Sequence, residues 1–243
     1  MRYRVGVTDF VRPAVPPLAL TLDLDDTLWP VGPAIERAEA QLHAWLRQHA
    51  PATADRFDTA GLRALRDEMA RTHPHWAHDL SAIRQESLRR ALAQAGDDVG
   101  LAQPAFEFFL SWRHRVEIYD DVVPALERLA ARFPLVALTN GNADLQTIGL
   151  DRWFRSVVSA RSFGVGKPNA AIFLEACRRA GAPAPRVLHV GDDLALDVRA
   201  ALAAGLQAAW VARPDIHADV QGAPEGARHV VRHLGELADR LGA

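Results

Sequence analysis

The sequence predicts an α/β protein whose core is a Rossmann-like, doubly wound parallel sheet and whose chain carries an inserted α-helical cap. Two observations predict this fold. From residue 118 onward, short apolar runs alternate with helical patterns, which is typical of a parallel sheet covered on both faces. Residues 30–117 show helical spacing without strand-like runs. We therefore expect a core of residues 1–29 and 118–243 and a helical cap of residues 30–117.

Each element follows from a local pattern. The apolar run at residues 18–22 predicts the first buried strand, and the runs at 135–138, 157–158, 187–190 and 208–211 predict four more. Helical patterns predict helices at 123–131, 169–180 and 194–204. Within the insertion, Ile35, Leu42, Ile83 and Leu92 recur at helical spacing.

Composition limits the partners and the compartment. The 243 residues are 49% hydrophobic, which is enough for one core and a modest second domain. A net charge of −2 shows no basic excess, so we expect no nucleic-acid partner. Asp9, Arg12 and Pro13 interrupt the N-terminal stretch, which argues against a signal peptide or a membrane partner. A lone cysteine, Cys177, fits a cytoplasmic protein.

An acidic segment, Asp23-Leu24-Asp25-Asp26-Thr27, directly follows the first strand. Ligands of open α/β sheets collect where strands end, so we expect its three carboxylates to lie where chemistry takes place. Their mutual repulsion requires a cation, a bound proton or a substrate to offset it. Because Mg²⁺ prefers oxygen ligands, the sequence predicts a magnesium cofactor at this edge of the sheet.

Three further segments follow strands or open a helix. Thr139 and Asn140 follow the second strand, Lys167 precedes the helix at 169–180, and Asp192 and Asp197 follow the fourth strand. Lys167 is the only lysine among the 28 basic residues, so we expect a compact ammonium in a site that a guanidinium would overfill. These are the groups that phosphoryl transfer requires.

The four segments together resemble the haloacid dehalogenase superfamily of phosphohydrolases. The resemblance extends to the bacterial subfamily that dephosphorylates flavin mononucleotide and 5-amino-6-(5-phospho-D-ribitylamino)uracil, an intermediate of riboflavin synthesis. It is carried by Asp-Leu-Asp-Asp-Thr-Leu-Trp at 23–29, Ser-Trp-Arg-His-Arg at 111–115, Leu-Thr-Asn-Gly-Asn-Ala at 138–143 and His-Val-Gly-Asp-Asp-Leu at 189–194. It implies a Mg²⁺-dependent phosphatase with the fold described above.

The resemblance and the chemistry together suggest catalytic roles. Asp23 is the expected nucleophile, because a carboxylate that attacks phosphorus divides hydrolysis into two easier steps. Asp25 is the expected general acid and base, serving first the leaving alcohol and then the attacking water. The Thr139 hydroxyl, the Asn140 backbone amide and the Lys167 ammonium are expected to bind the phosphoryl group, and Thr139 and Lys167 thereby take part in catalysis.

The resemblance also implies a set of metal ligands. They are the Asp23 carboxylate, the Asp25 backbone carbonyl and the Asp192 carboxylate, with Asp197 acting indirectly. Asp26 receives no catalytic role. Asp193 is expected to cap the helix at 194–204 in preference to binding a metal water.

The cap is expected to select the substrate. We expect Trp76 to stack on an aromatic ring and Arg84, Arg113 or Arg115 to contact polar edges of the same ligand. The alternative is packing inside the cap, which is the commoner role of aromatic residues at helical spacing. A zinc site at His73, His75 and His78 is a weaker alternative, because no cysteine or glutamate accompanies them in a known ligand pattern.

The expected reaction is Mg²⁺-dependent hydrolysis of a small soluble phosphate ester through an aspartyl-phosphate. A haloacid dehalogenase would use the Asp23 nucleophile on carbon and need no metal, but the dehalogenases of the family lack a carboxylate at the position of Asp25. A phosphotransferase or mutase would form the same intermediate. A non-enzymatic, receiver-like phosphoacceptor module would lack the helical insertion and have about half this length. The oligomeric state does not follow from the sequence.

Overall fold

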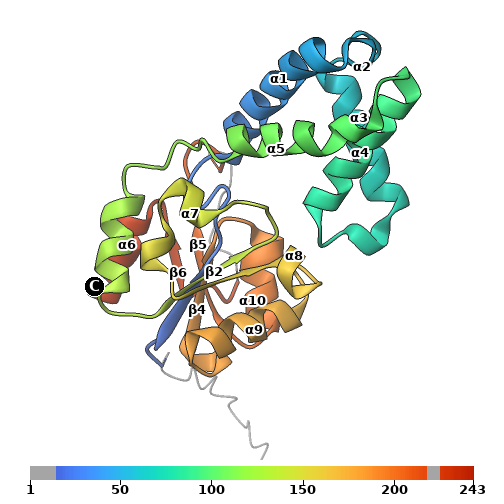
Figure 1. Ribbon diagram of the computed structural model, residues 1–243. Helices are drawn as coiled ribbons and strands as arrows, with labels where there is room; N and C mark the ends of the chain where they lie inside the picture. Colours follow the sequence, from blue (N-terminus) through green and yellow to red (C-terminus); the bar gives the residue numbers. More distant parts are fainter. Residues whose placement is uncertain (1–14, 218–224) are drawn as a thin grey trace, which may run out of the picture.

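The computed structural model of the protein describes residues 15–217 and 225–243. Within these residues a six-stranded parallel sheet has helices on both faces, and a separate group of helices lies beyond one end of the sheet (Figure 1). This confirms the predicted α/β class with an inserted helical region. The prediction about a signal peptide rests on residues that lie outside the described part of the chain.

The acidic segment follows the strand at the centre of the sheet. The strands are β1 (Ala19–Leu22), β2 (Leu135–Thr139), β3 (Ser156–Ser159), β4 (Val187–Gly191), β5 (Gln207–Val211) and β6 (His229–Val231). Their order is β3-β2-β1-β4-β5-β6, and all pairs are parallel. Leu20 of β1 therefore lies opposite Leu135 on one side and Leu188 on the other. The carboxyl ends of β1, β2 and β4 meet at one edge, which brings the segments that follow them together.

The helices of the core cover both faces of this sheet. On one face lie α6 (Val122–Ala130) and α11 (Leu234–Leu241); on the other lie α9 (Ala170–Ala180), the π-helical turn η5 (Leu194–Arg199) and α10 (Ala200–Ala203). Short turns complete the core: α7 (Leu145–Ile148), η3 (Asp151–Trp153), α8 (Ala160–Phe163) and η4 (Ala184–Arg186).

Alternate side chains of each strand enter two different hydrophobic cores, as the two-residue period of a strand requires. In β2, Leu135 and Ala137 pack with residues of α6 and α11, whereas Val136 and Leu138 pack with residues of α9 and α10. All residues of β1, β2 and β4 are buried. The central strands are therefore held from both sides, which gives the loops at their ends a rigid base.

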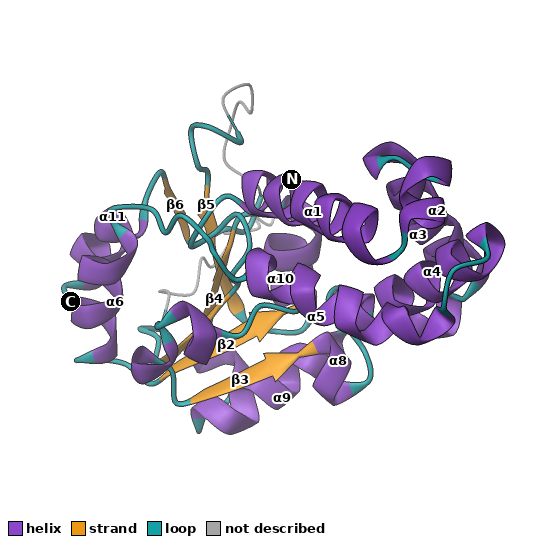
Figure 2. Cartoon of the chain, turned by 45° about the horizontal axis from the view of Figure 1, so that its top comes forward, coloured by secondary structure: helices purple, strands orange, loops and turns teal. Residues whose placement is uncertain are grey.

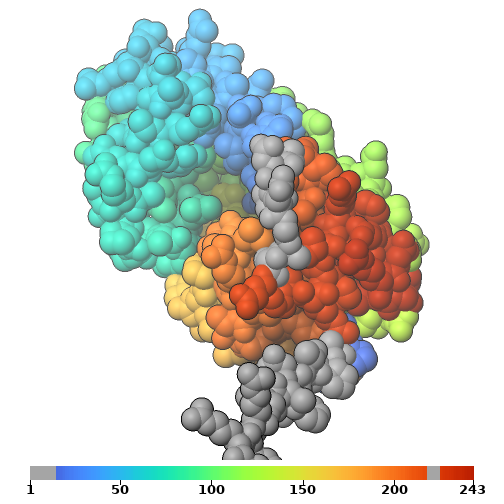
Figure 3. Space-filling model, turned by 180° about the vertical axis from the view of Figure 1, so that it is seen from behind, coloured from blue at the N-terminus to red at the C-terminus, as the bar shows by residue number. Residues whose placement is uncertain are grey.

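Five longer helices between β1 and α6 form the inserted region, which lies to one side of the sheet (Figure 2). They and their linking turns are α1 (Val31–His49), α2 (Pro51–Arg56), α3 (Thr59–Thr72), η1 (Pro74–Trp76), α4 (Leu80–Ala95), η2 (Val99–Leu101) and α5 (Ala102–Arg113). Leu42 and Leu46 of α1, Leu88 of α4 and Phe106 and Phe109 of α5 belong to a hydrophobic core of their own. In a view from behind, this region forms a body beside the sheet and its covering helices (Figure 3).

Besides the short turns α7, α8, η3 and η4, the described residues contain two elements that the sequence patterns did not predict, β6 and α11. β6 has three residues, which is too short to display the alternation that identifies a strand. The buried face of α11, formed by Leu234, Leu237 and Ala238, does have helical spacing, and this was the signal that could have identified it. No helix in residues 15–217 and 225–243 combines the length and apolar character needed to cross a membrane.

Leu126 provides a test of the first core. Its side chain on α6 is fully buried against the sheet, so Leu126→Ala leaves a cavity. We expect the free energy of unfolding to fall by about 2–5 kcal/mol in urea denaturation. Leu174→Ala on α9, at a residue that is 49% exposed, is the matched control and should lower it by less than about 1 kcal/mol. Equal losses in the two variants would contradict this packing.

Candidate active site

The chain turns sharply after β1. The Asp23 backbone N–H still bonds to the neighbouring strand, donating to the Val190 carbonyl oxygen at 2.9 Å. Asp26 then adopts a φ of 61°, in the left-handed region that favours glycine. The Asp26 carboxylate accepts a hydrogen bond from the backbone N–H of Val31, the first residue of α1, at 2.8 Å. This turn places the acidic segment at the sheet edge and directs the chain into the inserted helices.

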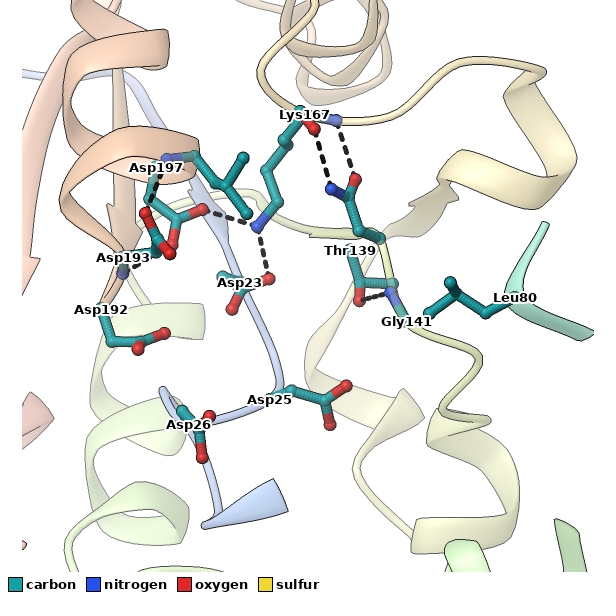
Figure 4. Close-up of a pocket in the computed structure, with 12 residues that line it drawn as sticks. Asp23, Asp25, Asp26, Leu80, Thr139, Gly141, Lys167, Asp192, Asp193 and Asp197 are labelled. Carbon is teal, nitrogen blue, oxygen red and sulfur yellow. Dashed lines mark hydrogen bonds and ion pairs between the residues drawn. The ribbon is translucent and has the colours of Figure 1, made fainter. Parts of the chain in front are cut away.

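Lys167 joins two of the acidic residues (Figure 4). Its Nζ donates to Oδ1 of Asp23 and to Oδ1 of Asp197, at 2.5 Å in each case. All three side chains are almost completely buried. Burial opposes the charged ammonium, but the Asp197 and Asp23 carboxylates outweigh it and raise the pKa of Lys167 above its ordinary value. The lysine is therefore a permanent cation beside the predicted nucleophile.

Asn140 fixes the backbone of Lys167. Its side-chain Nδ2 donates to the Lys167 carbonyl oxygen at 2.9 Å, and its Oδ1 accepts from the Lys167 N–H at 2.7 Å. Next to it, the Thr139 hydroxyl oxygen accepts from the Gly141 N–H at 2.8 Å. Because Thr139 and Asn140 follow β2 while Lys167 precedes α9, these bonds assemble one site from two distant segments.

The segment after β4 supplies two further carboxylates. A Cβ at Gly191 would lie 2.4 Å from Cγ of Asp197, so only glycine leaves room for that side chain. The Thr27 hydroxyl donates to Oδ1 of Asp192 at 3.1 Å, which links this segment to the one after β1. Asp193 accepts two hydrogen bonds from backbone N–H groups at the start of η5, as the sequence predicted for a helix cap.

The acidic cluster suits a divalent cation. Asp23, Asp192 and Asp197 each offer a carboxylate oxygen, and these oxygens lie within 4.8 Å of one another. Lys167 provides one positive charge against three carboxylates. Burial raises the pKa of Asp192 to about 7, with Asp197 adding to the shift, and burial also raises the pKa of Asp23 well above its ordinary value. Oxygen donors with excess negative charge are the ligands that Mg²⁺ requires.

The structure adds a buried histidine, His189, that sequence reasoning missed. Its Nε2 lies 3.0 Å from Oδ1 of Asp197, and its Nδ1 lies 2.8 Å from the Thr21 hydroxyl. Burial lowers the pKa of His189, so the neutral ring donates from Nε2 and accepts at Nδ1. A polar residue inside an otherwise apolar strand was the available signal. His189 therefore holds the carboxylate that in turn holds Lys167.

Asp25, the predicted acid and base, is held by groups from two directions. Nη2 of Arg113 donates to its Oδ1 at 2.6 Å and to its Oδ2 at 2.8 Å. Nε1 of Trp29 donates to the same Oδ1 at 2.8 Å. The Arg113 side chain is only 1% exposed, so it lies against Asp25 and does not face open space.

Besides a cavity of about 580 Å³ whose lining includes His75, His78, Asn140 and Lys167, two cavities that share a residue lie at the boundary between the sheet edge and the inserted helices. The first has a volume of about 250 Å³ and is lined by Asp23, Asp25, Asp26, Leu80, Thr139, Asn140, Gly141, Lys167, Asp192, Asp193, Leu196 and Asp197. The second has a volume of about 340 Å³ and is lined by Ile35, Arg66, Asp67, Ala70, Leu80, Ile83, Arg84, Phe109 and Asn142. Leu80 of α4 belongs to both, so the cavities adjoin.

Three of the residues predicted to contact substrate from the cap have different positions. Arg84 lines the second cavity, where its guanidinium lies over the Phe109 ring at 3.8 Å and donates to the buried Glu39 at 3.2 Å. Burial lowers the pKa of Arg84 to about 10, so it stays charged near neutrality. Trp76 stacks on the His73 ring at 4.7 Å and lines neither cavity. Arg113 also lines neither cavity.

Comparison with known proteins identifies the family. Residues 18–205 match the model of haloacid dehalogenase-like hydrolases. The chain is 35% identical over 210 residues to the 5-amino-6-(5-phospho-D-ribitylamino)uracil phosphatase YigB of Escherichia coli, covering 85% of this chain and 87% of that protein. It is 32% identical over 176 residues to a phosphoserine phosphatase of Thermus thermophilus, covering 70% of this chain and 66% of that protein.

A solved structure agrees with these sequence matches. The crystal structure of a 2-haloacid dehalogenase from Pseudomonas syringae superposes with a TM-score of 0.85 at 38% identity, covering 93% of this chain and 98% of that one. The chain belongs to the haloacid dehalogenase-like hydrolases. This confirms the family and the enzyme class predicted from the sequence, a haloacid dehalogenase-like phosphatase.

The raised pKa of Asp192 predicts how metal binding depends on pH. A cation binds the carboxylate form, so below pH 7 it must displace the Asp192 proton. We expect the dissociation constant for Mg²⁺ to be about tenfold larger at pH 6 than at pH 8, measured by calorimetry. Asp192→Asn should bind weakly at both values and with a smaller pH dependence than the wild type. An equal wild-type affinity at pH 6 and pH 8 would contradict this linkage.

The contacts of Lys167 predict that arginine cannot replace this lysine in catalysis. Its Nζ contacts two buried carboxylates at 2.5 Å, and a guanidinium, which is wider and planar, could not replace this compact ammonium without displacing them. We expect Lys167→Arg to lose about 10²-fold or more in kcat/KM for an aryl phosphate. Full retention of kcat/KM would show that positive charge alone is sufficient at this position. Arg161→Lys, at an exposed residue of α8, is the control for the reverse exchange and should retain activity.

Proposed function

We propose that the protein is a Mg²⁺-dependent phosphomonoester hydrolase that acts through an aspartyl-phosphate on Asp23. The observation that carries the proposal is the first cavity. There, the buried Asp23 carboxylate contacts the Lys167 ammonium, and the Asp25 carboxylate and the Thr139 hydroxyl line the same space. A nucleophile, a proton donor and groups for the phosphoryl oxygens are thus gathered at one strand edge.

In the first step, an Asp23 carboxylate oxygen attacks phosphorus and forms the new O–P bond. The bond between phosphorus and the ester oxygen breaks, and that oxygen takes the proton of Asp25 and leaves as an alcohol. Lys167, the Thr139 hydroxyl and the Asn140 backbone N–H stabilise the peripheral phosphoryl oxygens, on which negative charge is spread.

In the second step, water attacks the aspartyl-phosphate while Asp25, now a carboxylate, takes a proton from it. The bond between phosphorus and the Asp23 oxygen breaks, which releases phosphate and restores both carboxyl groups to their starting forms. Asp23, Asp192 and the Asp25 carbonyl would hold Mg²⁺, with Asp197 acting indirectly, and the bound ion would neutralise charge on the phosphoryl group.

We further propose that residues 30–117 act as a cap that selects the substrate. The second cavity supports this, because it adjoins the first at Leu80 and combines an apolar wall with polar groups. Its Phe109 and Ile83 suit a flat ring, while Arg84, Arg66 and Asp67 offer donors and an acceptor for polar edges of the same ring. A leaving group that occupies this space would lie directly beyond its phosphate in the first cavity.

The substrate that these features favour is 5-amino-6-(5-phospho-D-ribitylamino)uracil or flavin mononucleotide. Both join a flat, polar-edged ring to a phosphate through a ribityl chain. The 35% identity to YigB over 85% of the chain supports the first compound.

A reducing, cytoplasmic setting is consistent with Cys177, which is a free and buried thiol whose pKa burial raises to about 11.

Haloacid dehalogenation is the second candidate, since the structure from Pseudomonas syringae carries that description. Halide is a stable anion and leaves without a proton, so that reaction gives an acid at position 25 no task. The Asp25 carboxylate lines the first cavity and is held there by two donors, Arg113 and Trp29. This arrangement favours the phosphatase over the dehalogenase.

Phosphate release and chloride release distinguish the candidates. We expect p-nitrophenyl phosphate to be hydrolysed with Mg²⁺ and not after exhaustive chelation, and 2-chloropropionate to release no chloride. Asp23→Asn should lower kcat by about 10³-fold or more, because it removes the covalent step. Asp120→Asn, at an exposed residue outside the cavity, is the matched control and should keep wild-type activity.

The substrate requires a second measurement with the same protein. We expect kcat/KM for the ribitylaminouracil phosphate or flavin mononucleotide to exceed that for hexose phosphates and nucleoside monophosphates by about tenfold or more. A preference for the sugars or nucleotides would reject the flavin-pathway substrate and leave the phosphatase in place. Undiminished turnover by a folded Asp23→Asn variant would reject the proposed mechanism itself.

A further inference from the structure

Arg113 has one polar partner within the part of the chain that the structure describes. Its guanidinium makes hydrogen bonds only to Asp25, and Asp25 is the single carboxylate with which it forms an ion pair. The side chain is 1% exposed, and its Nη1 has no hydrogen-bond partner among these residues. A buried guanidinium without a second acidic partner is expensive to retain for stability alone. Its contact with Asp25 therefore points to a role of Arg113 in the candidate active site.

The two oxygens of Asp25 are held differently. Oδ1 accepts from both Nη2 of Arg113, at 2.6 Å, and Nε1 of Trp29, at 2.8 Å. Oδ2 accepts only from Nη2 of Arg113, at 2.8 Å. An ionised carboxylate oxygen has about two lone-pair positions, so Oδ1 is fully used while Oδ2 keeps one free. The free position is the one available for a proton.

Gly141 closes a third side of the same carboxylate. A Cβ at this residue would lie 2.5 Å from Oδ2 of Asp25, so any larger residue would displace the carboxylate. The Gly141 backbone, the Arg113 guanidinium and the Trp29 indole thus determine the orientation of Asp25. Asp25 and Gly141 both line the first cavity.

Arg113 also joins the acid and base to the inserted helices. It is the last residue of α5, where the chain leaves the inserted region and returns to the sheet. Trp29 precedes α1, where the chain enters that region, and its backbone is paired with Asp25 in an isolated bridge. Both connections between the two regions therefore meet at one carboxylate.

We propose that Arg113 is a positioning residue which, together with Trp29, orients Asp25 so that Oδ2 is the atom that exchanges protons with the leaving group and with water. The proposal rests on the proposed function of Asp25. In the first step the proton on Oδ2 moves to the ester oxygen as its bond to phosphorus breaks. In the second step Oδ2 takes a proton from the attacking water. Arg113 keeps its own proton in both steps and does not contact the substrate.

Leaving-group dependence separates this role from a structural one. An alkoxide needs a proton to leave, whereas p-nitrophenolate is stable without one. We expect Arg113→Gln to lower kcat/KM for an alkyl phosphate such as glycerol phosphate by about 10²-fold, and that for p-nitrophenyl phosphate by less than about fivefold. Arg113→Lys, which keeps a cationic donor, should give intermediate values. Arg89→Gln, at an exposed arginine of α4 that lines neither cavity, should match the wild type for both esters.

Two additional variants keep the test decisive if Arg113→Gln folds poorly. Trp29→Phe retains the buried ring but removes the Nε1 donor, and it should shift the alkyl-to-aryl ratio in the same direction by a smaller factor. The double variant Arg113→Gln with Asp25→Asn should be no less active than Asp25→Asn alone, because Arg113 acts through Asp25. Equal losses for both esters, or additive losses in the double variant, would overturn the proposal.

The same measurements distinguish a failure of the proposed role of Asp25 from a failure of the proposed role of Arg113. If Asp25→Asn itself leaves the alkyl-to-aryl ratio unchanged, the assignment of Asp25 as acid and base fails, and the role of Arg113 fails with it. If Asp25→Asn changes the ratio and neither Arg113→Gln nor Trp29→Phe does, the proposed function stands and only the positioning role is rejected.

Discussion

The active site depends on one ammonium shared between two buried carboxylates. Lys167 bonds to Asp23 and Asp197 at 2.5 Å each, and without it the three carboxylates of the cluster would face one another uncompensated in a site shielded from water. Two other contacts fix the ends of this bridge: Asn140 holds the lysine backbone, and His189 holds the far carboxylate. The geometry of the nucleophile is therefore determined by segments that follow β2 and β4, and not by its own loop alone.

The same ammonium does not balance the negative charge of all three carboxylates. Lys167 compensates Asp23 and Asp197, and its effect together with that of His189 outweighs burial and holds the pKa of Asp197 below its ordinary value. Asp192 has no lysine or arginine partner among the described residues, and burial raises its pKa, as it raises that of Asp23 in spite of Lys167. The cluster thus distinguishes between a carboxylate that is permanently charged and one that accepts either a proton or a metal ion. That difference in environment, within residues of identical chemistry, is what would allow a cation to enter a preformed site.

Sequence patterns predicted the site residues that follow strands. They did not predict contacts between side chains that are distant in the sequence. Asp23, Thr139 and Asp192 could be predicted because a buried parallel strand delivers the residue after it to a known edge. Lys167 could be predicted because it is the only lysine in the chain. The pairing of Arg113 with Asp25 could not, because it depends on how the end of α5 lies against the loop after β1. Arg84 was expected in the substrate space and lines the second cavity, whereas Trp76 stacks on a neighbouring histidine. A residue of the inserted helices can face either the core of that region or a cavity, and its spacing along the helix does not show which of the two it faces.

The central position of β1 has a consequence for the order in which the protein folds. β1 is made first, yet Leu20 finds its partners only in Leu135 and Leu188, after the entire inserted region has been synthesised. The helices α1 to α5 have a hydrophobic core built from nearer neighbours in the chain, so they can form early, during translation. β1 can pair on one side once β2 has been made, and on its other side only after β4 has followed. Until β2 has been made the apolar β1 segment has no partner strand, which makes the nascent chain more prone to aggregation than the folded protein.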